Sequence, residues 1–155
     1  MIRRTRLARL ILASAVLGAL AFGTVASTQA GGPKILDSGM SGIPTGGMVL
    51  DGVIGGGAPW KIAAGDVKLF ADGRLHVEVH GLLLLNGTNP IRNGRAIVAC
   101  GGAPAASSEI VPFSETGDAE VNTIVSLPSP CLAPVVFFAG VLPNGAERWF
   151  AVDSI

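Results

Sequence analysis

Apolar and polar residues alternate in two neighbouring stretches of the chain. Residues 67–71 read Val-Lys-Leu-Phe-Ala, and residues 75–80 read Leu-His-Val-Glu-Val-His. Asp72-Gly73 separates the two stretches, and an Asp-Gly pair between alternating segments is a strong hairpin signal. The pattern therefore predicts two antiparallel strands, each with an apolar face and a polar face.

Similar patterns continue toward the end of the chain. Asn144-Gly145 separates the apolar segments 134–142 and 148–152, and Asn86-Gly87 and Asn93-Gly94 indicate two more turns. Further candidate strands are 95–100, 109–113 and 119–127, while 82–85 and 135–138 are apolar on both faces, as covered central strands are. No window after residue 30 has the apolar spacing of an amphipathic helix. Seven or eight short strands predict an antiparallel β-sandwich over residues 59–155, with a small barrel as the alternative.

Residues 31–58 have a different composition from the rest of the chain. Ten of these 28 residues are glycine, and ordering so many glycines costs much conformational entropy. No Gly-Lys-Ser/Thr follows them, which argues against a phosphate-binding loop. We expect a flexible segment, with one short strand around residues 48–50.

The first thirty residues have the pattern of an export signal. Four arginines precede an uncharged apolar run over residues 10–26, and Thr28-Gln29-Ala30 places small side chains before Gly31. An n-region, an apolar region and a small-residue exit predict a secretory signal peptide over residues 1–30. The alternative is an uncleaved membrane anchor, but 17 residues with many alanines and glycines favour cleavage.

The net charge of the chain without its predicted signal peptide excludes some classes of binding partner. All eleven acidic residues lie after residue 30, whereas four of the eleven basic residues lie before it, so the mature chain has a net charge of −4. This balance lacks the basic stripe that nucleic acids require and the polybasic cluster that anionic lipids attract. We expect an extracellular or cell-envelope partner, no nucleic acid and no stable membrane insertion.

The chain has two cysteines, Cys100 and Cys131. In an oxidising compartment an even pair most simply forms one disulfide, which we predict here. A metal site or a catalytic thiol is the alternative. The spacing is not that of a C-x-x-C motif, and a nucleophilic thiol would need a histidine base nearby.

The strongest candidate for site chemistry is His76, Glu78 and His80. Period-2 alternation places all three on one face of a strand, with neighbours about 7 Å apart, and histidine and carboxylate side chains bind zinc or copper. The alternative is that this face is simply the solvated one, since residues from one strand seldom converge on an ion unaided. We predict no other cofactor.

Signals for catalysis or for sugar binding are weak. The chain after residue 30 contains no G-x-S-x-G, H-E-x-x-H or S-x-x-K motif. Asp118 and Glu120 share a predicted strand face, but an exposed carboxylate pair is usually only surface. Trp60 and Trp149 could form a platform for sugars, although a core role explains them equally well.

Several segments together carry a resemblance to known proteins. They are residues 71–82, Asn89-Pro90, 96–100, 117–119, 127–137 and 149–151. They resemble uncharacterised secreted bacterial proteins of small all-β type over about residues 60–152. The resemblance implies export and a cysteine-bridged sandwich, but no activity. Residues 72–82 are also loosely similar to CHRD domains, although the Ala-His-Ile-His segment of that family is missing here.

The sequence thus predicts a secreted, single-domain β-sandwich that is not an enzyme. Its expected role is that of an extracellular binding or structural module. The first alternative is a metal-binding protein that uses His76, Glu78 and His80, and the second is a secreted enzyme.

Overall fold

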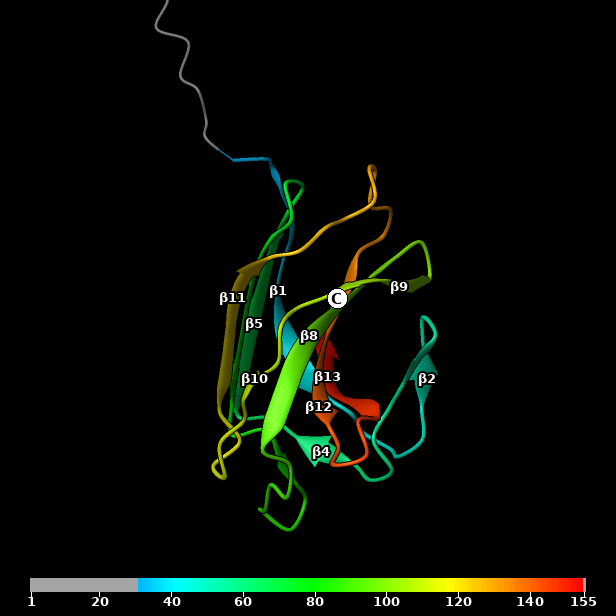
Figure 1. Ribbon diagram of the computed structural model, residues 1–155. Helices are drawn as coiled ribbons and strands as arrows, with labels where there is room; N and C mark the ends of the chain where they lie inside the picture. Colours follow the sequence, from blue (N-terminus) through cyan, green and yellow to red (C-terminus); the bar gives the residue numbers. More distant parts are fainter. Residues whose placement is uncertain (1–30, 155) are drawn as a thin grey trace, which may run out of the picture.

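The computed structural model describes residues 31–154, which form thirteen β-strands and no helix. Nine strands make one antiparallel sheet in the order β10-β8-β12-β13-β1-β5-β6-β11, with β9 added beside β8 (Figure 1). These strands are β1 (Lys34–Gly42), β5 (Ala64–Phe70), β6 (Arg74–His80), β8 (Asn93–Cys100), β9 (Ala103–Ser107), β10 (Val111–Pro112), β11 (Ala119–Ile124), β12 (Val135–Val141) and β13 (Glu147–Asp153). Two small sheets pair β2 (Val49–Leu50) with β3 (Val53–Ile54), and β4 (Trp60–Lys61) with β7 (Leu83–Leu84).

The large sheet curls into an open half-barrel because β1 belongs to both of its halves. Residues 34–39 of β1 pair with β5, and residues 40–42 pair with β13. Figure 1 shows β5 and β11 in one layer and β8, β12 and β13 in the layer facing it. The predicted all-β, antiparallel fold is confirmed, and the two facing layers of the half-barrel are continuous through β1.

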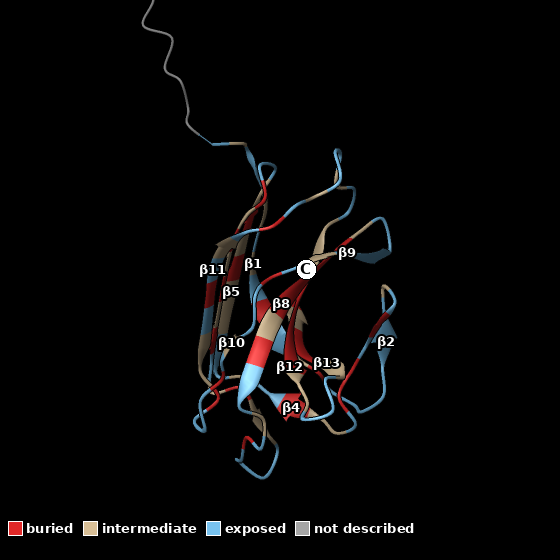
Figure 2. Ribbon diagram, viewed as in Figure 1, coloured by how far each residue is buried: buried red, intermediate tan, exposed pale blue. Residues whose placement is uncertain are grey.

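The core lies between these layers, and the alternation along β6 explains how it forms. Leu75, Val77 and Val79 are at most 1% exposed, while the residues between them face outward. Strand β12 is buried from Val136 to Gly140, as its apolar run predicts (Figure 2). The prediction of a covered central strand over residues 82–85 is wrong: Leu82 is buried, but Leu85 is 63% exposed.

Glycines at the predicted turns have two different roles. Gly73 and Gly145 adopt positive φ angles of 88° and 81° in the hairpin turns β5–β6 and β12–β13, and Gly87 does so at 82°, so these three turn predictions are confirmed. The predicted turn at Asn93-Gly94 is wrong, because these residues begin β8. A Cβ atom on Gly94 would lie 2.4 Å from Cζ of Phe138, so this glycine permits close packing.

The segment that we expected to be flexible, residues 31–58, is part of the folded domain. It contains β1 in the interior of the sheet order as well as the hairpin of β2 and β3. Ile43, just after β1, is fully buried. The boundary predicted at residue 58 is therefore wrong, whereas the short strand expected around residues 48–50 is present as β2. The predicted signal peptide, residues 1–30, lies outside the described residues.

The two cysteines form a disulfide, as predicted, with a Cα–Cα distance of 5.1 Å. Cys100 ends β8, and Cys131 lies in the long connection between β11 and β12. Beside the disulfide, Gly101 N donates a hydrogen bond to Leu132 O at 2.6 Å. The disulfide therefore ties a connection that has no strand of its own to the end of a central strand.

Both tryptophans belong to the core. Trp60 is 5% exposed and stacks on Phe150 with ring centroids 3.9 Å apart. Trp149 is 1% exposed, and its Nε1 donates a hydrogen bond to Val53 O at 3.2 Å. These rings hold β3, β4 and β13 together and do not form an exposed platform for sugars.

Candidate functional site

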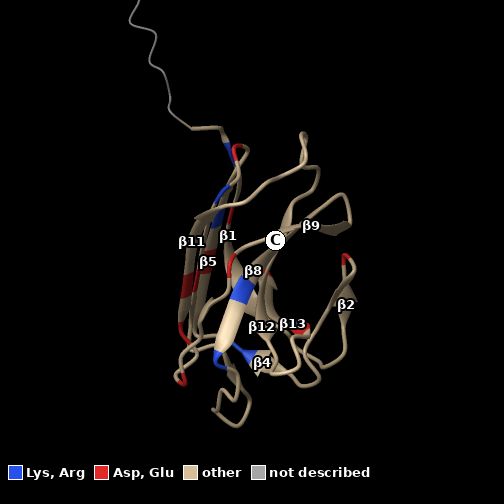
Figure 3. Cartoon of the chain, viewed as in Figure 1, with Lys and Arg blue, Asp and Glu red and all other residues tan. Residues whose placement is uncertain are grey.

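Charged side chains gather on the outer face of β5, β6 and β11. The strand register places Asp66 opposite Glu78, and Glu78 opposite Glu120, so that three carboxylates form one row across three strands. The next row contains Lys68, His76 and Asn122. Figure 3 shows acidic positions side by side in this layer. The outward faces of these strands therefore form a polar, largely acidic surface.

Within this surface, three side chains come close enough to share one ion. His76 Nε2 lies 3.9 Å from Asp66 Oδ2 and 3.9 Å from Glu78 Oε2. All three potential ligand atoms lie within 4.8 Å of one another, and each residue is half-buried. Zinc–ligand bonds of about 2.1 Å at tetrahedral angles separate neighbouring ligand atoms by about 3.4 Å. The observed separations of 3.9 Å are slightly longer than this, so the three atoms would have to move closer together to occupy three corners of a tetrahedron.

Asp66 is the member of this group that the sequence analysis missed, because it comes from the neighbouring strand. Its Oδ2 atom also lies 3.4 Å from Lys68 Nζ, in a pair whose side chains are both 43% exposed. Exposed pairs of this kind contribute little to stability. Lys68 therefore neutralises Asp66 only weakly, and a divalent ion would compete with it readily.

His80, which we predicted as a third ligand, lies differently. Its Nε2 atom is 2.7 Å from Glu78 Oε1, and its Nδ1 atom is 3.4 Å from Asp118 Oδ1. The hydrogen bond with Glu78 raises the pKa of His80 above its usual value, and Asp118 acts in the same direction. The structure thus groups His76 and Glu78 with Asp66, and places His80 on the other oxygen of Glu78.

Asp118 lies at the end of a loop, one residue before β11 begins. Its carboxylate accepts hydrogen bonds from Thr116 Oγ1 at 2.6 Å and from Gly81 N at 3.1 Å. These bonds, with the Thr116 contact the largest cause, lower the pKa of Asp118. Asp118 precedes β11, whereas Glu120 lies within it. The Asp118 carboxylate nevertheless contacts His80 on the same outer side of the sheet where Glu120 opposes Glu78.

A depression of about 380 Å³ adjoins the site on the same outer face. His76 and Asn122 line one part of it, and Phe70, Arg74 and Ile124 line another. The Arg74 guanidinium lies 4.0 Å from the centroid of the Phe70 ring. This volume is at the lower end of the range of small-molecule pockets. His76 thus lines a shallow depression that is open to solvent.

Comparisons with protein-family models, with curated proteins and with solved structures returned no match. Nowhere in residues 31–154 is there a helix long and apolar enough to cross a bilayer. Function is therefore inferred from the side chains themselves.

Proposed function

We propose that this chain is a secreted, non-catalytic binding module that holds a divalent transition metal on the outer face of β5 and β6. One observation carries the proposal: ligand atoms of Asp66, His76 and Glu78 lie within 4.8 Å of one another. The disulfide between Cys100 and Cys131 is compatible with an extracellular or periplasmic location.

The types of ligand favour zinc over calcium or magnesium. Imidazole suits zinc, copper and nickel, whereas the hard ions Ca²⁺ and Mg²⁺ prefer oxygen ligands alone. One nitrogen and two carboxylate oxygens are three protein ligands, and zinc sites with three protein ligands leave a fourth position for water or another molecule. The depression beside His76 gives such a molecule room.

The row of carboxylates supports the same proposal on different grounds. Asp66, Glu78 and Glu120 oppose one another directly on adjacent strands, and like charges in such positions destabilise a sheet. A bound cation would remove this repulsion. The repulsion destabilises the metal-free sheet, and its relief on binding would favour the metal-bound state.

Isothermal titration calorimetry of the purified, oxidised chain with zinc chloride tests the proposal. We expect one ion per chain, and a large loss of affinity in each of Asp66→Asn, His76→Gln and Glu78→Gln. Glu109→Gln, which changes an exposed glutamate between β9 and β10, serves as the matched control and should bind like wild type.

Two results would contradict the proposal. The first is no heat at micromolar zinc, which would favour a binding or structural module that uses no metal. The second is equal binding by the three site variants and the control. A titration with calcium chloride should give much weaker binding than zinc, because His76 offers a nitrogen ligand.

A further inference from the structure

His80 is the other histidine on the outer face of β6, and it contacts the proposed site without belonging to it. Its Nε2 atom lies 2.7 Å from Glu78 Oε1, while the second oxygen of Glu78, Oε2, faces His76. We propose that His80, held by Asp118, is a positioning residue that orients Glu78 toward the metal. This inference rests on the proposed function.

The contacts of His80 favour a role outside the set of ligands. Each ring nitrogen faces a carboxylate, Glu78 on one side and Asp118 on the other. A histidine ligand needs one nitrogen free for the metal, while the other usually donates to an outer partner. His80 would have to break one of these contacts to bind the ion that His76, Glu78 and Asp66 approach.

Asp118 is well placed to fix the imidazole because its own position is strongly determined. Its oxygens accept hydrogen bonds from Gly81 N and Thr116 Oγ1. The loop that carries it is joined to the end of β6 by the hydrogen bond from Leu82 N to Gly117 O at 2.9 Å. A Cβ on Gly117 would lie 2.5 Å from Leu82 N, so the two segments are in close contact.

The two oxygens of the Glu78 carboxylate therefore have different contacts. Oε1 is engaged by His80, and Oε2 remains available on the side of His76. Glu78 would then bind the ion through one oxygen in a fixed direction. Loss of an outer partner of this kind typically lowers metal affinity by 10- to 100-fold.

The experiment compares zinc affinity in wild type, His80→Ala, His80→Gln and Asp118→Asn, with the metal-free melting temperature of each measured in parallel. We expect about a 10- to 100-fold weaker affinity in His80→Ala, an intermediate value in His80→Gln, which keeps an N–H donor, and a smaller loss in Asp118→Asn. Glu109→Gln is the control for a surface charge change.

A cobalt-loaded sample separates positioning from ligation. If His80 only positions Glu78, the visible absorption bands of saturated Co²⁺ stay at the same wavelengths in His80→Ala, and only the concentration needed for saturation rises. Shifted bands would show that His80 is a ligand and would overturn the proposal, as would equal or tighter zinc binding in His80→Ala. If wild type binds no zinc, the proposed function itself fails. If wild type binds zinc and His80→Ala binds it with the same affinity, only the positioning role is refuted.

Discussion

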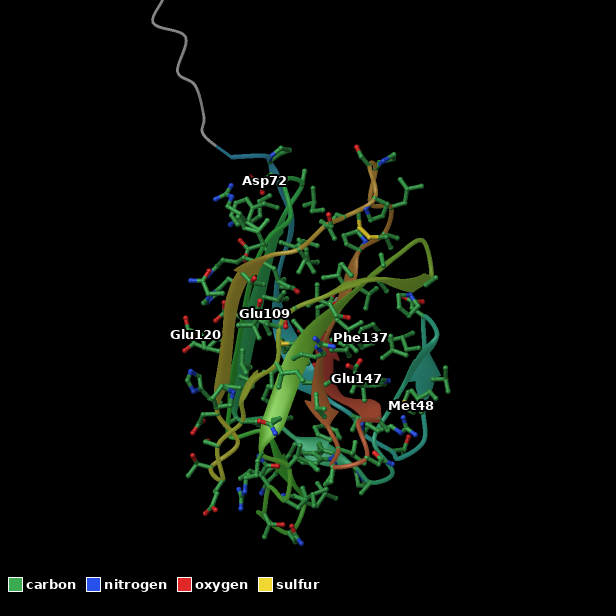
Figure 4. All side chains as sticks on the ribbon, viewed as in Figure 1. Met48, Asp72, Glu109, Glu120, Phe137 and Glu147 are labelled. Carbon is green, nitrogen blue, oxygen red and sulfur yellow. A yellow bond between two sulfur atoms is a disulfide. The ribbon has the colours of Figure 1, made fainter. Side chains whose placement is uncertain are left out.

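Glu78 of β6 and Glu120 of β11 occupy directly opposed positions on the outer face of the sheet. Asp66 opposes Glu78 from the other side, so Glu78 lies between two carboxylates. The Glu120 side chain projects from β11 away from the core (Figure 4). Directly opposed like charges on adjacent strands destabilise a sheet by a few tenths of a kcal/mol to about 1 kcal/mol.

Replacing Glu120 should therefore stabilise the metal-free protein. We expect Glu120→Gln to raise the free energy of unfolding by about 0.5 kcal/mol in low salt with a chelator present. Urea denaturation measures this difference, and high salt should reduce it because exposed charges are screened. An equal gain in Glu109→Gln would show that net charge, and not the row, is responsible.

The polar face of β6 could be predicted from the sequence, but its cross-strand partner could not. The alternation over residues 75–80 places His76 and Glu78 on one face regardless of the neighbouring strand. Asp66 joins them only because the turn between β5 and β6 has three residues, 71–73, so that Leu69 pairs with Leu75. A two-residue Asp-Gly loop would instead place residue 66 opposite residue 79 and turn its side chain to the wrong face.

The prediction that residues 31–58 are flexible failed for a different physical reason. Glycine density indicates a high entropic cost of ordering, but it says nothing about what the ordered segment packs against. Several of these glycines lie where no side chain fits: a Cβ on Gly42 would be 2.3 Å from Trp60 O, and one on Gly46 would be 2.3 Å from Gly57 O. Such contacts depend on how the folded chain brings these positions together, so local composition cannot reveal them.

The disulfide should contribute a large part of the stability. Cys100 and Cys131 close a loop across a sequence separation of 31, for which the chain-entropy estimate is about 3–4 kcal/mol. We expect the double variant Cys100→Ser/Cys131→Ser to lose about this much free energy of unfolding. Wild type treated with a reducing agent should match the double variant in chemical denaturation, and a loss below about 1 kcal/mol would contradict the prediction.

The close approach at Gly94 gives a prediction about packing. Besides Phe138 Cζ at 2.4 Å, a Cβ at this position would lie 3.1 Å from Ala139 O, so both a ring and the backbone of β12 would have to move. We expect Gly94→Ala to destabilise the fold by about 1–3 kcal/mol. Gly57→Ala is the matched control, since a Cβ there meets nothing within 4 Å. Thermal denaturation of the two variants should separate them clearly, and equal melting temperatures would contradict this role.

The buried carboxyl group of Asp153 should make the stability of the fold depend on pH. Its side chain is largely buried, and Oδ1 accepts a hydrogen bond from Val136 N at 2.7 Å. Burial raises the pKa of Asp153 above its usual value, and the charge of Asp51 adds to this effect. Because the native pKa lies above the unfolded value, the stability linked to this carboxyl is fully present below about pH 4 and is lost as the pH rises through the native pKa.

Asparagine at this position keeps the oxygen that Val136 needs but removes the ionisation. We therefore expect Asp153→Asn to be more stable than wild type at pH 7, and the difference to vanish below about pH 4, where wild type is protonated in both states.

Asp72→Asn should behave in the opposite way. The hydrogen bond from Gly32 N lowers the pKa of Asp72, with contacts to Arg74 adding to the effect, so this variant should be less stable than wild type at pH 7 and approach it as the pH falls. Chemical denaturation at pH 3, 5 and 7 measures both differences, and a gain in Asp153→Asn that does not change with pH would show that its ionisation is not the cause.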